Sequence, residues 1–170
     1  MIERMGFEKN RRIIRQYGNT RVTATVGENK CYFRSKLEYH WALYLEFLKT
    51  NGEIIKWEYE PKVFYFPDEK TAPVQYKPDF RVTEKDGTVV WHETKGYHDG
   101  KTNKKFQRMA KHYPNVIMDL VLQSIPRTGS KGANRRFNAQ RYVRRIVDSS
   151  TVFSQMKGII NFNLPKISKM

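Results

Sequence analysis

Two short stretches decide the fold of this chain, YKPDF at residues 76–80 and WHETK at residues 91–95. Residues 85–87 between them read KDG, and β-branched and aromatic residues flank this turn, so we predict two antiparallel strands. The carboxylates of Asp79 and Glu93 come from these adjacent strands. Carboxylates are natural ligands of a hard cation such as Mg²⁺, and a lysine two residues beyond the second one points to the same strand face. Such a set is typical of a site that holds a divalent cation against a phosphodiester.

The register of this hairpin determines whether Asp79 and Glu93 can share a metal ion. Directly opposed residues of an antiparallel pair point to one face, and a slip of one residue separates them. A two-residue turn would place Asp79 opposite Thr94, whereas a three-residue loop over 85–87, with its glycine in the left-handed conformation, places Asp79 opposite Glu93. We predict the three-residue loop.

A helix is predicted to begin near residue 35, because Ser35 and Glu38 form an S-x-x-E capping box and apolar residues follow at helical spacing up to Asn51. Glu38 has two alternative roles in this position. It can serve only as the capping glutamate, or it can point from the first helical turn toward the strand pair and act as a further metal ligand.

The remaining pattern predicts strands and helices in alternation, with one mixed sheet. We expect strands at 54–59, 63–66, 75–82, 88–94 and 116–122, and helices at 101–112 and 134–147. Residues 1–32 have weak periodicity and are predicted to be a polar, basic arm. The fold class is therefore α/β, with a mixed central sheet flanked by helices.

The formal net charge of +15 is concentrated at the two ends of the chain. Residues 1–34 carry a net charge of +5 and residues 124–170 a net charge of +9, whereas residues 35–123 carry only +1. Basic ends around a nearly neutral, carboxylate-containing segment suit a polyanionic partner. We expect this partner to be nucleic acid; the alternative is a merely solubilising surface charge.

Other classes of protein are disfavoured by composition. The single cysteine, Cys31, excludes an internal disulfide framework and a multi-cysteine zinc site. No apolar run approaches the roughly 20 residues needed to cross a membrane, and the first residues lack the pattern of a signal peptide. We expect an intracellular, cytoplasmic protein with no membrane partner.

The motifs PD at residues 78–79 and ETK at residues 93–95 resemble the signature of the PD-(D/E)XK nuclease family without departure. The phrases FRSKLE at residues 33–38 and YKPDF are similar to those of small phage-encoded endonucleases, including junction-resolving enzymes of DNA recombination. The resemblance implies a restriction-endonuclease-like core over residues 33–125. A basic N-terminal arm (1–32) and a basic C-terminal extension with an arginine-rich helix (126–170) then lie outside this core.

The resemblance also implies roles for individual residues. Asp79 and Glu93 would be metal ligands, Glu38 a further ligand, and Lys95 the catalytic lysine; the Thr94 carbonyl would also reach the metal. The cofactor would be Mg²⁺, for which Mn²⁺ would substitute, and the protein would be encoded by a phage in a bacterial host.

Basic residues around this core are candidates for contacts with DNA phosphates. They come from the strand segment before the first carboxylate, from the helix at 101–112 and from the arginine face of the helix at 134–147. They are Lys77, Lys101, Lys104, Lys105, Arg108, Arg135, Arg136, Arg141, Arg144 and Arg145.

The sequence therefore predicts a Mg²⁺-dependent DNA endonuclease, with two alternatives for its substrate. A structure-selective enzyme that cuts branched DNA such as Holliday junctions needs two sites on symmetric strands, and so a homodimer. A sequence-specific enzyme of restriction or homing type needs side chains placed in the major groove, and the sequence indicates no such element. A nucleic-acid-binding module without catalysis is the alternative from another class.

Overall fold

The computed structural model describes residues 20–96, 100–125 and 138–159, together with residues 129, 134 and 136. The order of its elements is mixed α/β. They are β1 (Val22–Val26), β2 (Asn29–Phe33), α1 (Lys36–Thr50), β3 (Ile54–Tyr59), β4 (Phe64–Tyr65), β5 (Gln75–Tyr76), β6 (Phe80–Glu84), β7 (Val89–Lys95), α2 (Gly100–His112), β8 (Ile117–Leu122), β9 (Arg145–Asp148) and α4 (Ser149–Ile159).

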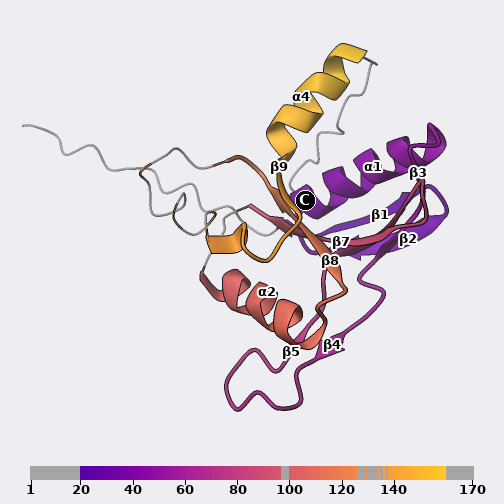
Figure 1. The fold of residues 1–170 in the computed structure, drawn as a ribbon. Coiled ribbons are helices and arrows are strands. Elements are labelled where there is room, and N and C mark those ends of the chain that lie inside the picture. Colours follow the sequence, from indigo (N-terminus) through magenta and orange to yellow (C-terminus); the bar gives the residue numbers. More distant parts are fainter. Residues whose placement is uncertain are drawn as a thin grey trace, which may run out of the picture.

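The central sheet has five strands in the order β3-β6-β7-β8-β9. Strands β3, β6 and β7 pair antiparallel, whereas β7, β8 and β9 pair parallel, so the sheet is mixed. Helix α1 covers one face and helix α2 the other (Figure 1). The predicted α/β class, a mixed sheet flanked by helices, is confirmed, and the arrangement is compatible with a restriction-endonuclease-like core.

Each face of the sheet has its own hydrophobic cluster. Trp41 and Leu45 of α1 pack with Phe80 and Val82 of β6 on one face. On the other face, Phe106 of α2 packs in a cluster with residues of β7, β8 and the β4–β5 segment. The three tryptophans are all buried in these clusters, as core residues rather than exposed platforms.

The β6–β7 hairpin has the predicted register. Phe80 lies opposite His92 and Thr83 opposite Val89, which continues to the pairing of positions 79 and 93. The loop is residues 85–87, closed by a 2.8 Å hydrogen bond from the Glu84 N–H to the carbonyl of Thr88. The glycine at position 87 has φ +88°, a left-handed conformation that other residues rarely adopt. The three-residue loop is confirmed.

Helix α1 begins with the predicted cap. The Ser35 hydroxyl accepts a hydrogen bond from the Glu38 N–H at 3.1 Å, which satisfies one of the free amides of the first turn. This cap fixes the first turn of α1, and with it Glu38, at one edge of the β6–β7 pair.

Residues 22–33, most of which we expected in an arm, form a hairpin. Strands β1 and β2 pair antiparallel, and Val22, Val26 and Phe33 are buried against α1. The alternation of apolar and polar residues over 22–26 carries this signal, because every second side chain of a strand points to one face. The sequence prediction missed this strand pattern because the surrounding segment is rich in charged residues.

The predicted helix over 134–147 is wrong in its second half. Residues 134, 136, 138 and 139 are helical, but the chain then turns, and Arg145–Asp148 forms strand β9 parallel to β8. The apolar residues of 145–148 fit both the helical and the strand period. Pairing with the edge of β8 favours the strand. The predicted arginine face of a single helix therefore does not exist.

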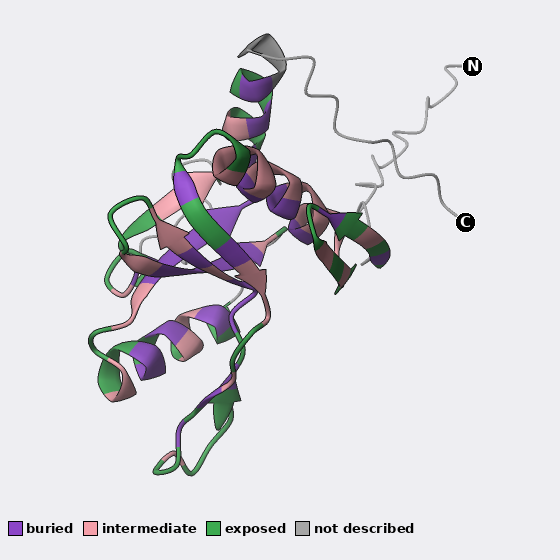
Figure 2. Ribbon diagram, turned by 90° about the vertical axis from the view of Figure 1, so that its right-hand side faces the viewer, coloured by how far each residue is buried: buried purple, intermediate pink, exposed green. Residues whose placement is uncertain are grey.

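The predicted strand over 75–82 divides into two. Residues 75–76 pair with β4 in a separate two-stranded ladder, and β6 begins only at Phe80. Strands β4 and β5 and the loop between them form an arm that projects from the body of the molecule (Figure 2). Among the described residues, no helix has both the length and the apolar character to cross a membrane.

Candidate active site

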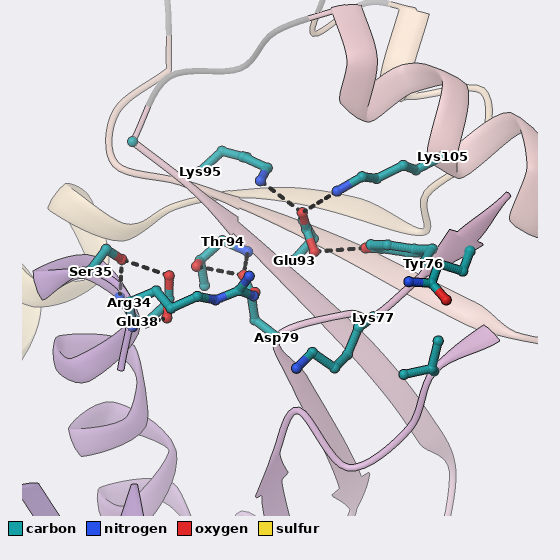
Figure 3. Close-up of a pocket in the computed structure, with 13 residues that line it drawn as sticks. Arg34, Ser35, Glu38, Tyr76, Lys77, Asp79, Glu93, Thr94, Lys95 and Lys105 are labelled. Atoms are coloured by element: carbon teal, nitrogen blue, oxygen red, sulfur yellow. Dashed lines mark hydrogen bonds and ion pairs between the residues drawn. The ribbon is translucent and has the colours of Figure 1, made fainter. Parts of the chain in front are cut away.

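The residues of the two sequence motifs meet in one pocket, of about 690 Å³, at the end of β7 where β6 begins. Side chains from α1, β5, β7 and α2 converge there (Figure 3). The pocket is lined by Arg34, Ser35, Glu38, Val63, Gln75, Tyr76, Lys77, Asp79, Glu93, Thr94, Lys95, Gly96 and Lys105. It therefore contains all four predicted catalytic residues, with acidic groups inside and basic groups around them.

Asp79 is buried and is held by strand β7. Its Oδ2 accepts hydrogen bonds from the Thr94 N–H and from the Thr94 hydroxyl, both at 2.8 Å. The carboxylate thus accepts the hydrogen bond of a β7 amide that a neighbouring strand would otherwise accept. Burial raises the pKa of Asp79 well above its usual range, and the charges of Glu93 and Glu38 raise it further, while the Thr94 N–H and Lys95 act in the opposite direction.

Glu93 is buried and bonded at both oxygens. The Tyr76 hydroxyl donates to Oε2 at 2.8 Å, and Lys95 Nζ lies 2.9 Å from Oε1. Lys105 Nζ lies 4.0 Å from the same oxygen and 5.1 Å from the centre of the Tyr76 ring. Burial and the charge of Glu93 raise the pKa of Tyr76, so this hydroxyl keeps its proton and acts as a donor.

Glu38 has the first of the two roles that the sequence left open, that of the capping glutamate. It accepts hydrogen bonds from the Ser35 hydroxyl at 2.9 Å, from the Arg34 N–H at 2.8 Å and from the Tyr59 hydroxyl at 2.6 Å. These bonds complete the cap of α1. Its charge nevertheless reaches the site, because it contributes to the raised pKa of Asp79.

The donor set fits a hard divalent cation. Three carboxylates lie around one pocket, and two of them, Asp79 and Glu93, are almost completely buried. A bound cation would offset the charges of Glu93 and Glu38 that raise the pKa of Asp79. In the described part of the chain, no three acidic, histidine or cysteine side chains are arranged as ligands of one ion. Asp79 and Glu93 are the carboxylates that the pocket would offer to such an ion.

Three residues in or next to the pocket had no role in the sequence prediction. Arg34 lies 3.4 Å from Asp79 Oδ1 and also pairs with Glu60, which in turn pairs with Lys77. Glu60 has φ +46° and donates its N–H to the Asp79 carbonyl at 2.7 Å. Tyr76 is the third. Arg34 and Tyr76 are direct or near neighbours of the motifs, and this proximity is the signal that could have indicated them.

The predicted DNA-contacting residues divide into two groups. Lys77, Lys101, Lys104 and Arg141 are exposed, and Lys105 and Arg136 are half-buried. Arg135 lies outside the described residues.

Arg108 requires a correction. It is only 4% exposed, donates to the Thr71 hydroxyl at 3.0 Å and to the Pro73 carbonyl, and pairs with Glu69 at 3.2 Å. It holds the β4–β5 arm against α2, so a role in binding phosphate is wrong for this residue.

Arg144 and Arg145 also have a structural role. Both donate to Asp119, which is fully buried in β8, and Arg144 bonds Glu84 as well. Burial raises the pKa of Asp119, but these hydrogen bonds and the nearby His92 lower it overall. Their guanidinium groups neutralise a buried carboxylate, which attaches β9 to the sheet. The sequence offered no sign of this, because Asp119 stands in an apolar run.

His92 points to the face opposite the pocket, because successive side chains of a strand alternate and it precedes Glu93. It accepts a hydrogen bond at Nδ1 from the Trp41 indole at 3.1 Å, and burial lowers its pKa to about 4. A neutral imidazole that packs against α1 fits a structural residue.

Comparison with known proteins gives the family of the chain. Residues 15–129 match the family described as "Protein of unknown function (DUF1064)". The chain belongs to this family. The DUF1064 match includes every residue that lines the pocket. No curated protein matches the sequence.

A crystal structure of a repair endonuclease from Pyrococcus abyssi matches with 19% sequence identity and a TM-score of 0.34. The match covers 71% of this chain and 49% of the other, so this chain spans about half the length of that protein.

Proposed function

We propose that this protein is a metal-dependent DNA endonuclease that hydrolyses phosphodiester bonds, with a preference for branched DNA such as Holliday junctions. The proposal is carried by one observation. Two buried carboxylates, Asp79 and Glu93, line a pocket together with Lys95, whose ammonium group lies 2.9 Å from Glu93. Structural ion pairs are common, but a set of buried acids beside an open, cation-rimmed pocket has little use for stability.

Asp79 and Glu93 would hold Mg²⁺ or Mn²⁺, with the Thr94 carbonyl and Glu38 as further candidates. When bound, such an ion supplies Lewis-acid stabilisation of a phosphate oxygen and a more acidic water. The remaining chemistry comes from the chain itself, beginning with the hydrogen bonds from Thr94 and Tyr76 that fix the two carboxylates.

Lys95 is the residue that would touch the reacting atoms. It lies beyond Glu93 on the same strand, and its ammonium group at the mouth of the pocket can hydrogen-bond an attacking water or a phosphate oxygen. A fixed positive charge there would stabilise charge that develops in the transition state. Arg34, Lys77 and Lys105 line the same opening and would attract the phosphate backbone.

Branched DNA is favoured over a specific sequence by where the charge lies. The excess of basic residues is at the two ends of the chain, and such charge recognises backbone and shape rather than base edges. Cutting two symmetric strands at a junction would need a homodimer with two sites.

The test uses purified protein with three DNAs: supercoiled plasmid, a four-way junction and linear duplex, each with Mg²⁺ or EDTA. We expect Mg²⁺-dependent cleavage, faster on the junction than on the duplex. Asp79→Ala and Lys95→Ala should abolish cleavage but keep DNA binding in EDTA. Lys85→Ala is the matched control, because Lys85 is exposed in the hairpin loop and outside the pocket.

The outcomes distinguish the endonuclease from a binding module, and branched DNA from other substrates. Cleavage of no DNA in any metal would leave a binding module and contradict the enzyme. Equal cleavage of junction and duplex, or cleavage confined to one sequence, would contradict the preference for branched DNA alone.

A further inference from the structure

The β4–β5 arm has two faces of opposite character. Phe64 and Tyr76 lie opposite each other in the ladder, are buried, and belong to the cluster beneath α2. Tyr65 lies opposite Gln75, and both are exposed. Because successive side chains of a strand point to opposite faces, one face anchors the arm and the other is presented outward.

The arm reaches the pocket through residues next to Tyr65. Val63 and Gln75 both line the pocket, and so does Lys77. Gln75 is the cross-strand partner of Tyr65, and Val63 is two residues before Tyr65 in the chain. Two positions along a strand are about 6.6 Å apart, which corresponds to about two nucleotide steps of 3.4 Å along one DNA strand. Tyr65 therefore lies within a few nucleotides of any phosphate held at the pocket.

Tyr65 is unusually exposed for an aromatic residue in this protein. Its side chain is 60% exposed, and Val74 beside Gln75 is 52% exposed, whereas the aromatic residues of the opposite face are buried. A flat ring next to a residue of a cation-lined pocket matches the way proteins hold unpaired nucleotides, with bases stacked on aromatic side chains and phosphates on cations. Stacking also suits a substrate of any sequence, since every base has a π-face.

We propose that Tyr65 is a stacking platform for an unpaired base next to the phosphate held in the pocket. This inference rests on the proposed function, and it names the feature of branched DNA that the site would select, namely a nucleotide free of its partner at the branch point. Gln75 lies beside the ring and contacts the same nucleotide, while Lys77 contacts its phosphate.

The experiment measures binding in EDTA, so it does not depend on cleavage. The probes are a duplex with a single-stranded branch carrying 2-aminopurine at the branch point, and the fully paired duplex of the same length. Tyr65→Ala should weaken binding of the branched probe by about fivefold or more, the effect expected for one lost stacked base. It should leave duplex binding unchanged and abolish the change in 2-aminopurine fluorescence that the wild type produces.

Two variants control for loss of structure. Tyr65→Phe keeps the ring and should bind the branched probe within about twofold of the wild type. Tyr32→Ala removes another exposed tyrosine, 53% exposed in β2 and outside the pocket, and should have no effect. Thermal unfolding of all three should resemble that of the wild type, because neither hydroxyphenyl group is buried.

Two outcomes would overturn the inference. One is equal affinity of the wild type and Tyr65→Ala for both probes. The other is a change of oligomeric state in Tyr65→Ala, measured by sedimentation, which would make the ring a contact between copies of the chain. Failure of the proposed endonuclease function would give a different result. No DNA would be cleaved with Mg²⁺, while the Tyr65-dependent fluorescence change in EDTA would persist.

Discussion

Replacing Asp79 by Asn should stabilise the metal-free protein while it removes the response to metal. Burial and the charges of Glu93 and Glu38 raise the pKa of Asp79 in the folded state. A group with a raised folded pKa contributes stability at low pH, and this contribution is lost as pH rises through that pKa. At pH values above the unfolded pKa of the carboxyl group, Asp79 therefore lowers the stability of the fold relative to low pH. An asparagine carries no charge, and its oxygen can still accept the bonds from Thr94.

The expected magnitudes follow from linkage. Each tenfold gain in proton affinity of Asp79 on folding corresponds to about 1.4 kcal/mol of unfolding free energy at neutral pH. A divalent cation at about 100 times its Kd stabilises a single site by about 2.7 kcal/mol. For a chain of 170 residues, 1 kcal/mol shifts Tm by about 2–4 °C, so saturating Mg²⁺ should raise the wild-type Tm by about 5–11 °C.

The assay is thermal unfolding at pH 7.5 of wild type and Asp79→Asn, each with EDTA and with a series of Mg²⁺ concentrations. In EDTA the variant should unfold at a higher temperature than the wild type. With Mg²⁺ the wild type should gain stability in proportion to the logarithm of concentration, whereas the variant should gain little. Ca²⁺ in parallel reports binding of a hard cation without any contribution from turnover.

The reasoning would be refuted by equal Mg²⁺ stabilisation of both proteins, which would place the cation elsewhere. A lower Tm of Asp79→Asn in EDTA would refute the electrostatic part, because it would mean that the carboxylate is stabilising in the folded state. Repeating the comparison near pH 4 should reduce the difference between the two proteins, since Asp79 is then protonated in the folded state.

Three further predictions concern the same site and its support. Lys95→Ala should reduce single-turnover cleavage by about 100-fold or more and leave junction affinity in EDTA within about twofold; a matching loss of affinity would contradict a role in the chemical step. Cleavage should rise with pH through the raised pKa of Asp79, and Thr94→Val, which removes a donor to the ionised carboxylate, should move this limb to higher pH in a pH–rate profile. Arg144→Ala removes two hydrogen-bond donors from Asp119. It should lower the unfolding free energy by about 1.5–3 kcal/mol, as expected for lost hydrogen bonds to a buried charge. Denaturant unfolding that matches the wild type would contradict this.

The parts of the structure set by local rules could be predicted from the sequence. The glycine at 87 selects the three-residue loop, this loop selects the register, and the register brings Asp79 and Glu93 to one pocket. The S-x-x-E motif likewise fixes the start of α1. These predictions succeeded because each depends on fewer than about a dozen neighbouring residues, whose geometry is restricted by backbone sterics.

The parts set by distant partners could not be predicted. Arg145–Asp148 is a strand because β8 offers it an edge, and its arginine is bound by Asp119, which lies 26 residues earlier. In the same way, Arg108 is buried because the β4–β5 arm folds back over α2 to meet it. The sequence prediction assigned Arg108 and Arg145 to DNA contact. It did so because a count of charges does not reveal which of them already have a partner in the fold.

Strand β7 has a ladder partner on each side at residues 90–92, β6 on one side and β8 on the other. Amides in the middle of a sheet exchange with solvent only when the whole domain opens, whereas those of short peripheral ladders exchange through local openings. Hydrogen exchange should therefore be slowest at residues 90–92 of β7 and fast in the two-residue strands β4 and β5. Glu93 thus adjoins the slowest-opening part of the sheet, whereas Tyr76, which donates a hydrogen bond to it, belongs to a short ladder that opens locally.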